Sequence, residues 1–290
     1  MVVSIAGFLP KLEKLSLNSI SRSTMHAPEL IGMPPYVPLV SGDNDIPPHP
    51  LLGEELSLPS LLRIPTLREL RIRDTHLGDP LWTRTPAACH LEVLELGGCM
   101  HESDDVNSIF IERIMSTVGP TVNEASLGTA IASNTAFSEP TQTPLKGLRK
   151  LRISPSFPLD SVVDTMTNLS GSPIESVSVR CFEDDVVDVC SAVESFLTLR
   201  VEKGFYKNLT SIDVSITPGD LLMSSTSDAK ERADAAKRLR EFCSDLRIGI
   251  LVSQSDDSAA TSQSEMGRSP DLTAPDKILG ERHCCAKVNI

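Results

Sequence analysis

Two cysteine–histidine pairs offer the types of ligand that zinc binds. Cys89 and His90 are adjacent, and Cys99 and His101 follow shortly afterwards. The seven cysteines contain no CxxC pair, however, so the spacing matches neither a zinc ribbon nor a dense disulfide framework. We therefore expect free, mostly buried thiols in a reducing compartment, and no bound metal.

Adjacent carboxylates at Asp184-Asp185 are a second arrangement that could do chemistry, here acid–base catalysis. They also lie where a helix is expected to begin, and acidic residues favour the positive end of the helix dipole. The chain contains no GxGxxG, phosphate-loop, GxSxG or HExxH motif. The sequence thus predicts a non-catalytic protein without a cofactor.

The composition favours a protein partner over nucleic acid or a membrane. The 290 residues carry 27 basic and 39 acidic side chains, and the resulting net charge of −12 repels phosphate backbones. No apolar run approaches the roughly 20 residues that cross a bilayer, so we expect a cytoplasmic or nuclear protein. Hydrophobic residues make up 40% and aromatic residues only 4%, which predicts an aliphatic core.

One pattern recurs along the chain: apolar, two variable residues, apolar, one variable residue, apolar. Six clear copies and one weaker copy (residues 122–127) start 24 to 55 residues apart; leucine-rich repeats have a period of about 20–29 residues. The last two apolar residues of each copy lie two apart and so share one face of a strand. The copies span residues 12–17, 67–72, 91–96, 122–127, 148–153, 174–179 and 209–214. Residues 51–58 offer a hidden copy, and residues 248–252 a last strand.

Apolar residues at helical spacing follow most copies. The helices expected on this basis span residues 104–118, 159–170, 184–200 and 228–243. The first would turn Val106 and Ile109 inward, and the last would turn Ala229 and Ala233 inward. The third would turn its apolar residues inward, namely Val186, Val189, Cys190, Val193, Phe196 and Leu197, and Gly204 suits its end. Alternating strands and helices imply parallel strands with right-handed crossovers. We expect an α/β leucine-rich-repeat solenoid, a horseshoe with strands on its concave face and helices and loops on its convex face.

The repeat domain is expected to span residues 1–252, with two interruptions. Residues 28–59 contain eight prolines, which neither donate to a ladder nor continue a helix, so they predict an irregular insertion. Residues 129–144 are polar and turn-rich and predict a loop. Residues 253–290 hold no aromatic residue and predict a disordered tail.

The repeat offers a structural explanation for Cys99. This residue falls eight positions after Leu91, where leucine-rich repeats use Asn or Cys to hydrogen-bond the turn after the strand. Cys89 and His90 lie at the opposite end of that strand. We therefore interpret Cys99 as a structural thiol in preference to a zinc ligand.

Side chains between the last two apolar positions of each copy point to the open face of the sheet, and the next outward position does the same. Adjacent parallel strands would place Arg71 beside Glu95 as a cross-strand pair. The alternatives are ordinary solvated positions or a polar surface of mixed sign that binds a protein partner. The predicted protein-binding residues are Arg71, Arg73, Glu95, Arg152, Arg180 and Asp213.

Four segments, LPKLEKLSL (9–17), IPTLRELRI (64–72), CHLEVLELGGC (89–99) and LKGLRKLRI (145–153), resemble the irregular leucine-rich repeats of fungal F-box proteins. In that family the F-box docks on the adaptor subunit of a cullin-type ubiquitin ligase, and the repeats hold the protein to be ubiquitinated. The chain enters a repeat by Leu9 and shows no F-box of its own. The resemblance implies the substrate-recognition part of such a ligase subunit, with the adaptor as a partner if an F-box lies upstream. The alternative is a leucine-rich-repeat scaffold or regulator without a ubiquitin role.

Overall fold

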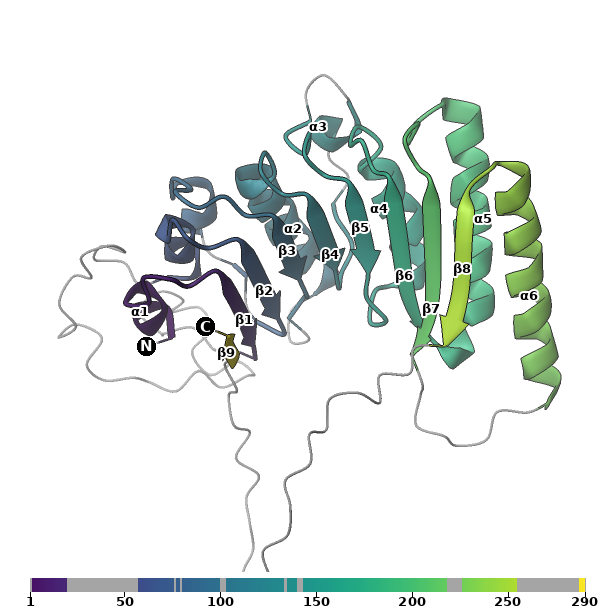
Figure 1. Ribbon diagram of the computed structural model, residues 1–290, viewed down its shortest axis with the longest axis horizontal. Helices are drawn as coiled ribbons and strands as arrows, with labels where there is room; N and C mark the ends of the chain where they lie inside the picture. The colour runs from purple at the N-terminus through teal and green to yellow at the C-terminus, as the bar shows by residue number, and fades with distance from the viewer. Residues whose placement is uncertain are drawn as a thin grey trace, which may run out of the picture.

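A single sheet forms the centre of the computed structural model (Figure 1). Eight parallel strands follow one another in chain order, and β9 adds antiparallel to β1. The strands are β1 (Lys14–Asn18), β2 (Glu69–Arg73), β3 (Val93–Leu96), β4 (Glu124–Leu127), β5 (Lys150–Ile153), β6 (Ser176–Phe182), β7 (Ser211–Thr217), β8 (Gly249–Gln254) and β9 (Lys287–Asn289). The structure describes residues 2–19, 57–75, 77–78, 80–99, 103–132, 135–139, 143–217, 226–254 and 287–289.

The helices form a second layer, and Figure 1 shows α2, α4, α5 and α6 on one side of the sheet. The α-helices are α1 (Val2–Gly7), α2 (Asp104–Val118), α3 (Thr135–Ser138), α4 (Val162–Asn168), α5 (Val186–Lys203) and α6 (Thr226–Asp245). Shorter 3-10 helices are η3 (Leu58–Arg63), η4 (Pro80–Thr83), η5 (Leu159–Ser161) and η6 (Glu183–Asp185). We call the other side of the sheet the open face.

The same pair of backbone hydrogen bonds joins each strand to the next from β1 to β7. The carbonyl of Glu13 accepts the N–H groups of Arg68 and Glu69, at 2.8 and 2.9 Å. The carbonyl of Arg68 in turn accepts those of Glu92 and Val93, at 2.7 and 3.1 Å. The carbonyls of Glu92, Asn123, Arg149 and Glu175 repeat this relation, and we call the series the carbonyl relay. Because each strand starts just after its relay carbonyl, the strands share one register.

In each copy, the last two apolar residues lie two positions apart and point into the core on the helix side of the sheet. Leu70 pairs with Leu94 and Ile72 with Leu96, and the corresponding residues of β1 to β7 are at most 2% exposed. Burial of alternate residues explains why the pattern specifies strands with one buried face. The α/β class and the parallel strands at all seven copies are confirmed, and β8 confirms the strand expected at residues 248–252. The sequential order is consistent with a solenoid.

Most of the expected hidden copy at residues 51–58 lies outside the described residues, and only Ser57 and Leu58 are described. β1 pairs directly with β2, with Leu15 opposite Leu70, so no strand lies between them. The 3-10 helix η3 starts at Leu58 instead, and Ser57, Leu58 and Pro59 are buried. The remainder of the Pro-rich stretch, residues 28–56, lies outside the described residues.

The stretch of residues 129–144, expected to be a polar loop, contains the short helix α3 and contributes to the core. Phe137 of α3 is fully buried, and its carbonyl accepts the Gly171 N–H at 2.9 Å. One aromatic residue in a polar stretch is a weak sequence signal, which explains the difference. For the tail, residues 255–286 lie outside the described residues, and Lys287–Asn289 form β9.

Most expected helices are found, but α2 and α6 turn a different side toward the core from the side that the sequence predicts. Val106 and Ile109 of α2 are exposed, whereas Asn107 and Ile111 face the core. In α6, Ala229 and Ala233 are exposed and Ala235 and Ala236 are buried. The expectation for α5 is confirmed in its six core residues and in Gly204, which ends the helix at a φ of 71°, a left-handed conformation that favours glycine.

Removing the Phe137 side chain tests the importance of α3. We expect Phe137→Ala to lower the free energy of unfolding by about 3–5 kcal/mol, because it leaves a cavity in the core. The matched control is Phe8→Ala, since Phe8 is 64% exposed. Urea unfolding measures both, and equal effects of the two substitutions would contradict the packing described.

Candidate functional site on the open face

Polar side chains form rows across the open face because the strands share one register. The middle row consists of Ser16, Arg71, Glu95, Ser126, Arg152, Ser178, Asp213 and Leu251, and each residue is the register partner of the next. Neighbouring members lie about 4.8 Å apart along the row. The expected placement of Arg71 beside Glu95 is confirmed.

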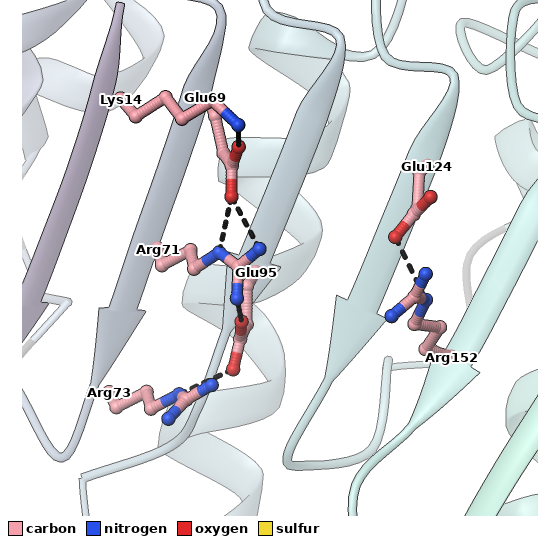
Figure 2. Close-up of polar contacts among 7 residues, drawn as sticks. All are labelled: Lys14, Glu69, Arg71, Arg73, Glu95, Glu124 and Arg152. Atoms are coloured by element: carbon pink, nitrogen blue, oxygen red, sulfur yellow. Dashed lines mark hydrogen bonds and ion pairs between the residues drawn. The ribbon is translucent and has the colours of Figure 1, made fainter. Parts of the chain in front are cut away.

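A chain of alternating charges runs from β1 to β3 (Figure 2). Lys14 Nζ lies 3.0 Å from Glu69 Oε2, and Glu69 also pairs with Arg71. Arg71 Nη1 lies 3.6 Å from Glu95 Oε2, and Glu95 pairs in turn with Arg73. The side chains of Glu69 and Glu95 are 12% and 14% exposed, whereas those of Arg71 and Arg73 are 42% and 54% exposed. The arginines therefore cover the carboxylates and face the solvent.

The electrostatic environment keeps Glu69 ionised. Burial raises the pKa of its carboxyl, but hydrogen bonds and positive charge from Lys14 and Arg71 outweigh this effect. The pKa therefore lies below its ordinary value of 4.5. Glu69 therefore carries its negative charge at neutral pH.

A separate ion pair lies further along the sheet. Arg152 Nε lies 2.8 Å from Glu124 Oε1 on the adjacent strand β4 (Figure 2). Asp213 accepts a hydrogen bond from Ser178 Oγ at 3.2 Å. Arg180 differs from the other predicted arginines, since no carboxylate of the described residues lies within ion-pair distance of it. The six predicted site residues thus share one face, and their role in binding stays a prediction.

A depression of about 540 Å³ opens near the carboxyl ends of β2 to β6. Arg71, Arg73, Arg152 and Arg180 all line it, with Gly97 and Gly128 among the residues between them. The glycines are required because the strands approach closely there: a Cβ on Gly128 would lie 2.9 Å from Gly97 Cα. Side chains are absent at these positions, so the surface is hollow between the arginines of β2 and those of β5 and β6.

Asn107 holds one wall of this depression. The buried Asn107 side chain accepts the Cys99 N–H at 2.9 Å and donates to the Cys99 carbonyl at 3.0 Å. The turn after β3 is therefore fixed by an amide on α2, and not by the Cys99 side chain as the sequence suggested. Val106 N–H donates to Ser103 Oγ, which caps the start of α2.

Sequence reasoning missed several participants. Lys14, Glu69 and Glu124 occupy the first position of their strands, one residue before the buried pair. Alternation along the strand assigns this position to the open face, so the same rule could have found them. Asn107 carried no comparable signal, because it interrupts an apolar helical face.

The described cysteines are free and buried, as expected. Burial raises the pKa of Cys181 to about 12 and those of Cys190 and Cys243 to about 11, so these thiols are protonated at neutral pH. Burial also raises the pKa of Cys89. His101 lies outside the described residues, and within them no three His, Cys, Asp or Glu residues form a metal-ligand group.

No family model matches this chain, and no curated protein or solved structure shows significant similarity to it. Within the described part of the chain, no helix is both long and apolar enough to span a membrane. The geometry of the open face is therefore the basis for a functional argument.

The contribution of Glu69 to stability should depend on pH. A carboxyl with a lowered pKa stabilises the folded state at neutral pH, and this contribution is lost as the pH falls through the folded-state pKa. We expect Glu69→Gln to lower the free energy of unfolding by up to about 1 kcal/mol, because the cationic partners are exposed. Urea unfolding at neutral pH and well below pH 4.5 measures the difference. A difference that is equally large under acidic conditions would contradict the ion-pair description.

The Asn107 amide should contribute more to the free energy of unfolding than a surface ion pair does. Asn107→Leu leaves the buried backbone groups of Cys99 without partners, so we expect a loss of about 2–3 kcal/mol in the free energy of unfolding. Ser108→Ala on the same helix is the control, because Ser108 is buried but makes no bond to this turn. Thermal unfolding compares them, and a loss as large for Ser108→Ala would contradict this role of Asn107.

Proposed function

We propose that this protein is a leucine-rich-repeat protein that binds another protein on its open face. The observation that carries the proposal is a parallel sheet with only one buried face. Parallel sheets are ordinarily covered by helices on both faces, whereas a stack of repeats leaves one face available for binding. The chain-order strands and the carbonyl relay support this interpretation.

The size and charge of the open face favour a protein over a small molecule. Eight strands at about 4.8 Å spacing give a face roughly 34 Å across. Exposed guanidinium groups over shielded carboxylates present donors in fixed positions, and arginine is enriched at protein interfaces. The middle row is therefore well suited to an extended segment or domain with complementary charge.

The ubiquitin role is the more specific part of the proposal. It is supported by the resemblance of the repeat segments to those of fungal F-box proteins, which implies that the bound protein is a substrate for ubiquitination. A scaffold or regulator without ubiquitin chemistry uses the same surface and is the alternative. Both place the partner on the open face in a cytoplasmic or nuclear compartment, without catalysis by this chain.

Charge reversal tests the binding surface. We expect Arg71→Glu with Arg152→Glu to reduce partner recovery about tenfold or more, since both remove exposed donors and introduce repulsion. The control, Lys230→Glu with Arg240→Glu on α6, makes the same change in net charge at exposed positions away from the open face. Affinity capture from the native cell with quantitative mass spectrometry measures recovery, and thermal unfolding confirms that each variant folds.

Equal recovery by the wild type and the open-face variant would refute binding at this surface. The identity of the recovered proteins distinguishes the two roles. A cullin-ligase adaptor among the proteins recovered with the native gene product supports the ligase role, whereas other partners without the adaptor support the scaffold.

A further inference from the structure

Arg152 and Arg180 lie where two depressions of the open face meet. The first, of about 540 Å³, and a second of about 430 Å³ over β5 to β7 are both lined by these two arginines. Arg152 pairs in register with Ser178, and Arg180 follows two residues later on the same strand. Strand spacing and rise place their Cα atoms about 8 Å apart. Two long guanidinium side chains at this separation can contact one bound group.

Their charge is only partly compensated. Arg152 uses Nε to bind Glu124, and its side chain is 50% exposed, so its terminal nitrogens can still donate. Arg180 is exposed and has no ion-pair partner among the described residues. The opposite end of the first depression, near β2 and α2, carries Arg71 and Arg73 together with three carboxylates, those of Asp74, Glu95 and Asp104. Glu124 is the acidic lining residue beside Arg152 and Arg180. The end between β5 and β6 therefore carries the excess of positive charge.

Hydroxyl groups line the first depression as well. Its lining includes Ser126, Ser154 and Ser156. Ser154 lies two residues after Arg152, and its strand position is beside that of Arg180, because Ile153 pairs in register with Val179. Ser154 Oγ lies 3.2 Å from Ser156 Oγ and 3.3 Å from the point where a Gly128 side chain would begin. The Ser154 hydroxyl therefore lies between the two arginines and the side-chain-free surface at Gly128.

We infer that Arg152, Arg180 and the Ser154 hydroxyl form a subsite for an oxyanion, either a carboxylate or a phosphate group. Guanidinium groups bind both anions through charge-assisted hydrogen bonds, and hydroxyls supply further donors. The inference rests on the proposed function, because the oxyanion belongs to a side chain of the protein segment that binds the open face. It specifies that this segment places an acidic or phosphorylated residue over Gly128.

Direct titration tests the subsite without the unknown partner. The full chain is titrated at low ionic strength with inorganic phosphate and, separately, with acetate, while NMR follows the arginine Nε–H signals. We expect saturable shifts with the wild type and about tenfold weaker binding with Arg180→Gln, which removes a charge-assisted bond. Arg68→Gln is the matched control, because Arg68 is an exposed arginine that pairs with Glu92 outside both depressions.

Ser154→Ala tests the contribution of the hydroxyl. Ser154 is only half-buried, so we expect unchanged thermal stability together with weaker anion binding, because the substitution removes one donor. Anion binding by Ser154→Ala that equals the binding by the wild type would overturn the place of this hydroxyl in the subsite.

The two anions identify the source of the oxyanion. Tighter phosphate binding supports a phosphorylated side chain, and tighter acetate binding supports a carboxylate. Shifts that do not saturate, or equal binding by the wild type and Arg180→Gln, would overturn the inference. If the inference fails in this way, a loss of partner recovery in the variant with Arg71→Glu and Arg152→Glu would still support the proposed function. Anion binding together with unchanged partner recovery in that variant would contradict the proposed function but not the subsite.

Discussion

The common register of the parallel strands is the constraint on which the rest of this structure depends. Each strand from β1 to β6 begins one residue after a carbonyl of the carbonyl relay, whose members run from Glu13 to Glu175. Every buried apolar pair therefore stacks on the next, and every open-face residue aligns with its counterpart. A register shift of one residue would exchange the two faces, so burial of the apolar rows also fixes the polar ones.

This constraint explains how an open face can be charged without being unstable. Neighbouring residues of a row are close enough to interact, so like charges side by side would repel. Glu69 and Glu95 instead lie between cationic neighbours, with Lys14, Arg71 and Arg73 reaching over them. The carboxylates thereby hold the arginines in place from the sheet side, while N–H donors of the arginines face the solvent. Arg180 departs from this scheme and gives the surface its local excess of positive charge.

The sequence predicted the strands well because each depends on a short local pattern with a fixed periodicity. The core face of α5 was predicted for the same reason. Phe137 and Asn107 were missed because their roles depend on contacts outside their own segments. Phe137 is buried in the core and its carbonyl accepts the Gly171 N–H, whereas Asn107 bonds to the turn after β3. The sequence predicted which residues lie on the open face. Which of them form ion pairs depends on how far each side chain reaches across the strands. The long Arg73 side chain, for example, joins Glu95 diagonally.

The uneven spacing of the copies has a consequence for the assembly of the sheet. Leu15 and Leu70 are register partners 55 residues apart, whereas Leu70 and Leu94 are 24 residues apart. Loop-closure entropy grows only with the logarithm of loop length, so the longer closure costs about 0.7 kcal/mol more than the shorter one. This penalty is small beside the burial of a single leucine, about 1.5–3 kcal/mol. The length of the connection between β1 and β2 therefore costs the sheet little, whereas the buried residues of η3 restrict sequence change at the end of that connection.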